Sequence, residues 1–241
     1  MTGREQRRAQ SRKEIIEAAA RAIAERGYHG MSMRDLARAT DRSLAGFYNY
    51  FASKDDVLFA LQKEAFETLV ASTRQALAEV HDAAARLYVF IHNHVRYFAE
   101  HPDVMRVLVH EAAALPPSRR RLIRALKEQY FEIGREIVRV VVEEGCGDGA
   151  AVPRGSVDDP ELERATYGVF GMMNWVYAWY DPKQHGPPSD VARTIHRITL
   201  CGLVARCPYT RLQDTLDARL ASVATPPLIG LGTSGAGGRT R

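Results

Sequence analysis

The 241-residue sequence predicts an all-α protein with a helix-turn-helix near its N-terminus. Residues 32–56 have the pattern of two short helices around a tight turn, followed by the start of a third helix. After residue 54, apolar residues recur at helical spacing, and no segment alternates with the period of two that a half-buried strand requires. A hydrophobic content of 46% is ordinary for a globular core.

Caps and apolar positions indicate the first two helices of this motif. Ser32 is spaced to cap the first helix together with Asp35, and Ser43 is placed to cap the second. Phe47 and Phe51 stand one helical turn apart and would hold the second helix on the core. The remaining positions of that helix then face outward and can enter a major groove: Leu44, Ala45, Gly46, Tyr48 and Asn49.

A third helix is expected to begin at Lys54. Ser53 and Asp56 form another capping box before it, and the positively polarised start of a helix suits a phosphate group. Gly46 costs about 1 kcal/mol relative to Ala inside a helix. Its presence on the exposed face indicates that DNA backbone or a thymine methyl comes close there.

Four short motifs in this region resemble the DNA-binding domain of the TetR (tetracycline repressor) family. They are Gly27-Tyr28-His29-Gly30, Met33-Arg34-Asp35-Leu36-Ala37, Phe47-Tyr48-Asn49-Tyr50-Phe51 and Ser53-Lys54. The resemblance covers residues 12–61. It departs from the family at Arg42, where a small apolar residue is common, and at Leu44, where Lys or Arg is common. We therefore infer from the family how this helix docks on DNA, but not which bases it prefers.

The resemblance implies that Tyr48 and Lys54 contact backbone phosphates while residues 44–49 face base edges. A phenol and an ammonium suit phosphate oxygens, and the Asn49 amide can pair with adenine. Aromatic packing is an alternative explanation for Tyr48, and it is the preferred one for Tyr50. The predicted DNA-contacting residues are Arg34, Ser43, Leu44, Ala45, Gly46, Tyr48, Asn49 and Lys54.

Charge supports a DNA-binding N-terminus. Residues 1–54 hold eleven Lys or Arg against six Asp or Glu, whereas the whole chain carries only +4. An N-terminal arm that lies along the DNA backbone, as in the family, would use the basic residues of this segment: Arg4, Arg7, Arg8, Arg12 and Lys13. A solvated, disordered terminus explains Arg4 to Arg8 equally well.

Beyond residue 56 the sequence predicts a second helical domain, residues 57–207, and then a flexible tail, residues 208–241. Helices are expected at 57–80, 87–98, 103–114, 118–144, 161–180 and 191–203. Residues 145–160 are rich in Gly, Asp and Pro and predict a mobile loop. The tail matches a dinucleotide fingerprint at residues 230–235, but we reject it because the required strand, helix and acidic residue are missing.

The segment 161–180 is apolar on nearly every side from Tyr167 onward. A soluble helix of this kind faces its own core on one side and another subunit on the other. The resemblance implies that this helix and the one at 191–203 pair with their copies in a dimer. Two recognition helices related by a two-fold axis then predict a near-palindromic operator of double-stranded DNA.

We expect neither an enzyme nor a cofactor or metal site. The sequence lacks a GxSxG elbow, an HExxH pair, a P-loop and a CxxC motif. Its three cysteines have no metal-ligand spacing, and His94 is interpreted as a core histidine whose hydrogen bonds are satisfied. The lack of a signal peptide and of an apolar run of about 18 residues predicts a cytoplasmic protein.

Met and aromatic side chains at 172–180 suggest a binding site for an acyl chain or an aromatic ring. This segment also resembles TetR-family regulators of fatty-acid, sterol or aromatic-acid degradation, which implies an acyl-CoA effector. Arginines near Pro116-Pro117 would hold its phosphates. The predicted effector residues are Met105, Val109, Tyr130, Met172, Met173, Asn174, Trp175, Trp179, Arg119 and Arg120. The alternatives are a sensor of free hydrophobic compounds, or a C-terminal domain that is purely structural.

Overall fold

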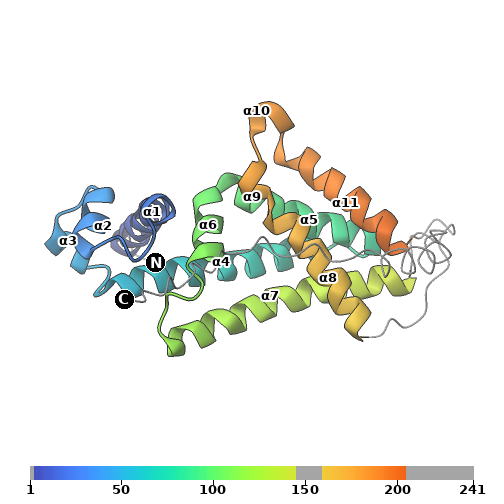
Figure 1. The fold of residues 1–241 in the computed structure, drawn as a ribbon, viewed down its shortest axis with the longest axis horizontal. Helices are drawn as coiled ribbons and strands as arrows, with labels where there is room; N and C mark the ends of the chain where they lie inside the picture. The colour runs from blue at the N-terminus through green and yellow to red at the C-terminus, as the bar shows by residue number, and fades with distance from the viewer. Residues whose placement is uncertain (1–2, 145–158, 205–241) are drawn as a thin grey trace, which may run out of the picture. The chain divides into compact units, whose positions relative to one another are not determined.

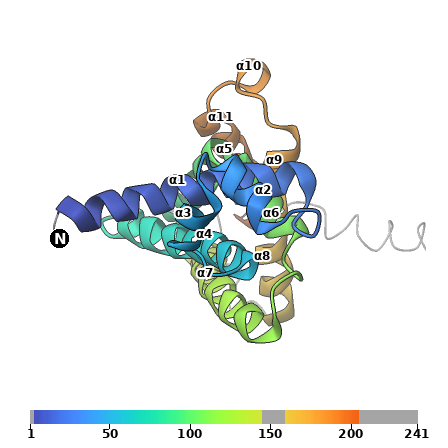
Figure 2. The ribbon, with the colours of Figure 1, turned by 90° about the vertical axis from the view of Figure 1, so that its left-hand side faces the viewer.

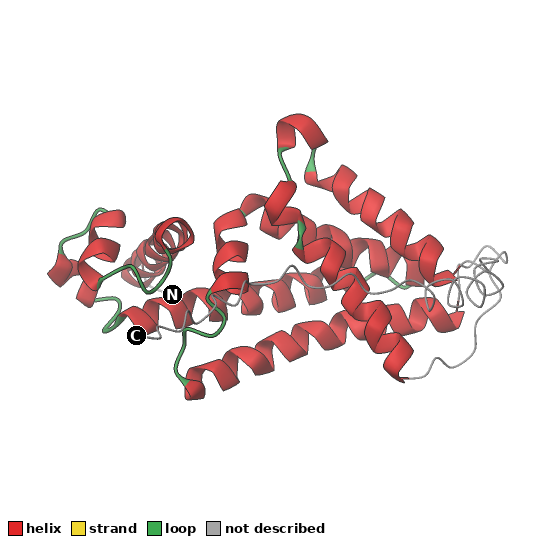
Figure 3. Ribbon diagram, in the orientation of Figure 1, coloured by secondary structure: helices red, strands yellow, loops and turns green. Residues whose placement is uncertain are grey.

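The computed structural model describes residues 3–144 and 159–204, and every regular element in these stretches is a helix (Figures 1 and 3). The all-α prediction is confirmed. The helices are α1 (Gly3–Arg26), α2 (Met33–Ala39), α3 (Leu44–Tyr48), α4 (Lys54–Leu77), α5 (Ala83–Glu100), α6 (Pro102–His110), α7 (Pro117–Glu144), α8 (Asp159–Asn174), α9 (Val176–Trp179), α10 (Pro182–His185) and α11 (Pro188–Val204). None of these described helices has the length and apolar character needed to cross a membrane. The predicted tail and most of the predicted loop lie outside the described residues.

Three helices begin at the serines predicted as caps. Ser32 Oγ accepts from the Asp35 amide at 3.2 Å, while Asp35 Oδ2 accepts from the Ser32 amide at 2.9 Å, which completes the capping box before α2. Ser43 caps α3 through the Gly46 amide at 3.1 Å. Ser53 caps α4 in the same way. Local spacing of the residues therefore decides where these helices start.

Helices α1, α2, α3 and the start of α4 gather around a first core, at the end of the molecule that faces the viewer in Figure 2. Phe47 and Phe51 are buried there with ring centroids 5.9 Å apart. Other members of this core come from α1, α2 and α4 and include Ile15, Ile23, Leu36, Leu58 and Leu61. The short α3 is thus held by Phe47, with Leu44 packed partly against the same core, while Ala45 and Tyr48 stay exposed.

Helix α4 continues from the first core into a second one. Leu58 and Leu61 belong to the first core, whereas Leu69 and Val70 belong to the second. Helices α5, α7, α8 and α11 complete the second core around it. The apolar stripe predicted on α5 is buried in this core: Leu87, Phe90, Ile91, His94, Val95 and Phe98.

Helix α6 is shorter than predicted and contributes to both cores. It carries Met105, which is buried in the second core, and Val107, which is buried in the first. The predicted helix at 103–114 ends at His110 because Glu111 is held by other elements. Its carboxylate accepts from the Tyr28 amide at 2.9 Å, and its carbonyl accepts from Gln62 Nε2 at 3.2 Å.

The prediction of one continuous helix over 161–180 is wrong, because the chain leaves α8 after Asn174 and resumes as α9. At this point the hydrogen bonding tightens to the spacing of a 3₁₀ turn, with the Ala178 amide donating to the Trp175 carbonyl at 3.0 Å. The Trp175 side chain is 63% exposed, so no burial in the core holds this residue in the helical register.

The packing of α7 against two aromatic rings gives a stability prediction. A Cβ at Gly134 would lie 2.9 Å from both Phe90 Cζ and Phe170 Cε2, so Gly134→Ala overpacks the second core. Overpacking costs about 1–3 kcal/mol, which outweighs the gain of about 1 kcal/mol from replacing a helical glycine. We expect a lower thermal midpoint by calorimetry.

Gly168→Ala on α8 is the matched control, since a Cβ there meets nothing within 4 Å. It should raise the midpoint through helix propensity alone. Equal stabilisation by both substitutions would contradict the packing described for Gly134.

Candidate functional site

The predicted recognition surface lies on α3 and its caps. Ala45, Tyr48 and Asn49 are exposed, and Tyr48 keeps 49% of its surface accessible to solvent. Leu44 and Gly46 are half-buried and Ser43 is exposed. The structure thus brings residues 43–49 together as α3 and its two cap residues, with Phe47 fully buried.

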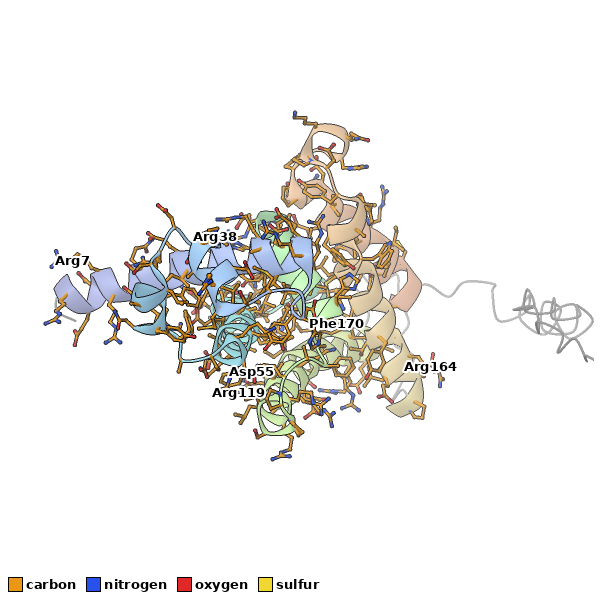
Figure 4. The ribbon with its side chains drawn as sticks, turned by 60° about the vertical axis from the view of Figure 1, so that its left-hand side comes forward. Arg7, Arg38, Asp55, Arg119, Arg164 and Phe170 are labelled. Carbon is orange, nitrogen blue, oxygen red and sulfur yellow. The ribbon has the colours of Figure 1, made fainter. Side chains whose placement is uncertain are left out.

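Arginines border this surface on α2 and on the turn. Arg34, Arg38 and Arg42 line a groove of about 360 Å³ together with Ser43 and Leu44. Arg34 and Arg38 are exposed one helical turn apart (Figure 4 labels Arg38), whereas Arg42 lies over the Tyr50 ring at 5.1 Å. Arg38 and Arg42 are absent from the predicted set, although the spacing of Arg34 and Arg38 on one face of α2 carried the signal.

Lys54 is held by the turn before α2. Its Nζ donates to the carbonyls of Tyr28 at 3.0 Å and Met31 at 2.9 Å, and it lies 4.3 Å from the centroid of the Tyr28 ring. An ammonium has three N–H donors, so one is left for another acceptor. Burial raises the pKa of Tyr28, and so does the hydrogen bond that the Tyr28 hydroxyl donates to Asp55. Contact of Lys54 with a phosphate stays a prediction.

The basic residues near the N-terminus fall into two groups. Arg4, Arg7 and Arg8 are exposed on the first turns of α1, and Arg7 projects from its free end in Figure 4. Arg12 instead forms an ion pair with Glu64 on α4 and lies over the Phe51 ring at 5.3 Å. Three of these cations are therefore available to DNA, while Arg12 joins α1 to α4.

A second candidate site is a cavity of about 430 Å³ among α4, α5, α6, α7 and α8. It contains four of the predicted effector residues, Met105, Val109, Tyr130 and Asn174. Sequence reasoning missed several other lining residues, among them Phe98, Leu108, Lys127 and Phe170. Apart from Lys127, His94, Tyr130, Tyr167 and Asn174, the described lining is apolar, as expected for a site that binds a hydrophobic molecule.

The other predicted effector residues do not line this cavity. Met173 is buried in the second core, and Arg119 on α7 is ion-paired with Asp56 beside the labelled Asp55 in Figure 4. Arg119 also lies over the Phe59 ring at 5.3 Å, while Arg120 is exposed. The structure therefore places the Arg119 guanidinium between α7 and α4, outside the lining of the cavity.

Three further predicted residues, Met172, Trp175 and Trp179, line a separate apolar groove of about 640 Å³ against α11. Trp175, Trp179 and Ile198 in this groove are 63%, 43% and 56% exposed. Gly171 lines both the groove and the cavity. Helix α8 thus separates the two spaces, and at Gly171 no side chain adds to the wall.

His94 is the most perturbed group on the cavity wall. Its Nδ1 lies 3.1 Å from the Tyr130 hydroxyl, whereas its Nε2 is buried without a hydrogen-bond partner, so the interpretation of a fully satisfied histidine is wrong. Burial lowers the pKa of His94 to about 3, and Asn174 offsets only part of this shift. Burial also raises the pKa of Tyr130. Within the described residues, no three His, Cys, Asp or Glu side chains gather as a metal site.

Comparison with known proteins matches both parts of the chain to one family. The model of bacterial regulatory proteins of the tetR family matches residues 15–61, and that of the tetracyclin repressor-like C-terminal domain matches residues 80–203. The chain is similar to the TetR family transcriptional regulator PfmR from Thermus thermophilus. The two are 33% identical with a TM-score of 0.67, over 79% of this chain and 99% of that one.

Two further similarities cover less of the sequence or show the fold alone. A fatty acid metabolism regulator protein from Bacillus subtilis (strain 168) is 30% identical over 86 residues, 36% of this chain and 44% of the relative. AibR, solved in complex with isovaleryl coenzyme A and operator DNA, shares the fold at 22% identity and a TM-score of 0.65, over 78% of this chain and 97% of that one. The chain spans less than half the length of the curated relatives it matches.

These matches cover the helix-turn-helix and the helical domain in the order that the fold shows. The C-terminal model alone accounts for more than half of the 241 residues. Members of this family are regulators and not enzymes. The chain therefore belongs to the tetR family of bacterial regulatory proteins.

Proposed function

We propose that this protein is a ligand-responsive transcriptional repressor that releases a near-palindromic operator when a small hydrophobic effector, an acyl-CoA, binds. The observation that carries the proposal is that one chain combines an exposed helix-turn-helix face with an apolar cavity, and that α4 and α6 enter both cores. We assign DNA reading to residues 1–56 and effector binding with dimerisation to residues 57–207.

Reading of DNA is assigned to α3, in a major groove. Asn49 and the small residues Ala45 and Gly46 face base edges, while the Tyr48 hydroxyl and the arginines on α2 face phosphates. The serine cap keeps the N-terminal amides of α3 in place at the same surface. This division predicts that sequence choice and overall affinity depend on different side chains.

A second copy of this chain is the partner that we assign to the groove between α8 and α11. Its large apolar side chains are solvent-exposed in a single copy, and soluble proteins rarely leave such a patch uncovered. A two-fold axis through this face would also supply the second recognition helix that a palindromic operator needs.

Helix α6 is the proposed link between effector and DNA. Met105, Leu108 and Val109 line the cavity, Val107 packs in the first core, and Glu111 just beyond the helix accepts from the Tyr28 amide. A ligand that displaces α6 therefore displaces the helix-turn-helix. If the ligand favours the arrangement that does not bind DNA by about 3 kcal/mol, DNA affinity falls about 150-fold. DNA then weakens ligand binding by the same factor.

The effector class rests on the cavity and on two similar proteins. The cavity is mostly apolar and has the exposed cation Lys127 on its lining, which suits an acyl group with an anionic remainder. AibR was solved with isovaleryl coenzyme A, and the Bacillus subtilis relative is a fatty acid metabolism regulator. The alternative effector is a free hydrophobic compound, which the same apolar lining would also accept.

The groove of arginines on α2 predicts a change in salt dependence. Arg34→Ala should reduce binding to specific and nonspecific DNA alike, and should lower the slope of log Kd against log salt by about one unit per subunit. Fluorescence anisotropy at several salt concentrations measures both effects. Arg164→Ala removes an exposed charge from α8 and should leave the slope unchanged. An unchanged slope in Arg34→Ala would remove this residue from the interface.

The exposed groove between α8 and α11 predicts the dimer interface. Trp175→Glu and Ile198→Glu should each give monomers in sedimentation velocity, because they bury a charge between copies. Leu122→Glu is the matched control, since Leu122 is 58% exposed but lies on α7 away from this groove. Dimers that survive both groove substitutions, or that fail in Leu122→Glu, would contradict the assignment.

The cavity predicts which variant loses the effector response. Octanoyl-CoA should raise the thermal midpoint and release operator DNA, and Leu108→Trp, which fills the cavity, should abolish the rise in thermal midpoint. Leu122→Trp makes the same exchange on the surface and should respond normally. Stabilisation by free hydrophobic compounds but by no CoA ester would favour the alternative effector, and no response to any compound would indicate a structural domain.

A further inference from the structure

The cavity contains a polar atom that its apolar lining leaves unpaired. His94 is buried, and only its Nδ1 has a partner, the Tyr130 hydroxyl at 3.1 Å. Nε2 is buried as well and has no hydrogen-bond partner among the described residues. Because buried polar atoms in proteins are nearly always paired, an unpaired ring nitrogen on a cavity wall indicates that a ligand supplies the partner.

Hydrogen bonds also fix polar side chains that neighbour His94 on α4 and α5. They begin at Ser72, whose hydroxyl donates to the Leu69 carbonyl at 3.3 Å. Since that proton is used, the Ser72 oxygen accepts the 2.9 Å hydrogen bond from Asn93 Nδ2. This fixes the orientation of the Asn93 amide, and its Nδ2 also donates to Thr73 Oγ1 at 2.9 Å.

The group that meets His94 at the cavity is Tyr130. Burial raises the pKa of Tyr130, which keeps its hydroxyl protonated and able to donate. Tyr130 then donates its own proton to His94 Nδ1. A neutral imidazole carries one proton, and because Nδ1 accepts, that proton is on Nε2. His94 therefore presents an N–H donor.

The His94 ring is neutral and held in one orientation. Its low pKa keeps it uncharged at neutral pH. Its plane lies 17° from that of Tyr130, with centroids 5.8 Å apart, and it meets Phe98 and Phe170 edge-on at 4.7 and 6.2 Å. A neutral donor among aromatic rings suits a neutral acceptor, since a buried anion would need a cation beside it. Lys127, the cation of the described lining, is exposed to solvent.

We propose that His94 Nε2–H donates a hydrogen bond to an uncharged carbonyl oxygen of the bound effector. Asn174 lines the same cavity, and its side chain raises the pKa of His94 by less than burial lowers it. This inference rests on the proposed function and deepens it. The ligand class becomes a thioester, ester or ketone with its carbonyl inside the cavity and any anionic group toward Lys127, rather than a free acid with a buried carboxylate.

Two ligands that differ only in the carbonyl test this contact. Octanoyl-CoA carries a thioester carbonyl, and S-octyl-CoA has a methylene in its place. In titration calorimetry with the full chain, we expect octanoyl-CoA to bind about fivefold more tightly, the net effect of one hydrogen bond. His94→Phe should bind both with equal affinity, while His94→Gln, which keeps an N–H donor, should recover part of the preference. Leu108→Ala should weaken both ligands and leave their ratio unchanged.

The protonation state can be read without any ligand. Nitrogen-15 NMR of the intact protein should show the Nε2-protonated tautomer for His94, assigned by loss of its signals in His94→Gln. The Nδ1-protonated tautomer would overturn the proposal, because Nε2 would then be an acceptor.

A pair of ligands without CoA, acetophenone and ethylbenzene, separates this inference from the proposed effector. If neither CoA compound binds but acetophenone is preferred through His94, the carbonyl site holds and acyl-CoA is the wrong effector. If octanoyl-CoA binds and releases DNA but S-octyl-CoA binds equally well, or the preference survives in His94→Phe, the carbonyl contact is wrong and the effector stands. Binding of neither pair overturns both.

Discussion

The continuity of α4 is the constraint on which the rest of the structure depends. One unbroken helix supplies Leu58 and Leu61 to the core around the helix-turn-helix and Leu69 and Val70 to the core around the cavity. Close-packed interiors resist small displacements, so a shift of this helix in one core is felt in the other. The ion pair between Arg119 and Asp56 ties the start of α7 to the start of the same helix.

Features governed by local spacing were predictable from the sequence. The serine caps, the pairing of Phe47 with Phe51 and the buried stripe of α5 follow from residues three or four positions apart, where helical spacing decides which side chains meet. The break between α5 and α6 followed from Pro102 in the same way. These local features were enough to give the fold class and the recognition helix.

The lining of the cavity was only partly predictable, because composition does not tell which side of a helix each residue occupies. Met172, Met173 and Asn174 are consecutive, yet they contribute to the outer groove, the core and the cavity respectively, since each residue of a helix turns by about 100°. Arg119 is paired with Asp56, 63 positions away, and such pairing is invisible in one sequence. Whether His94 Nε2 has a hydrogen-bond partner likewise depends on side chains from the other four helices around the cavity, α4, α6, α7 and α8.

The glycine in α8 that lies against both the cavity and the outer groove has an evolutionary consequence. Any side chain introduced at Gly171 must enter one of the two spaces, because the residue borders both. Under the proposed pairing of subunits, a change of ligand selectivity made at this position also alters the surface by which copies recognise each other. Duplicated genes that diverge here in what they sense would stop forming mixed dimers, and would separate into independent regulators by the same substitution.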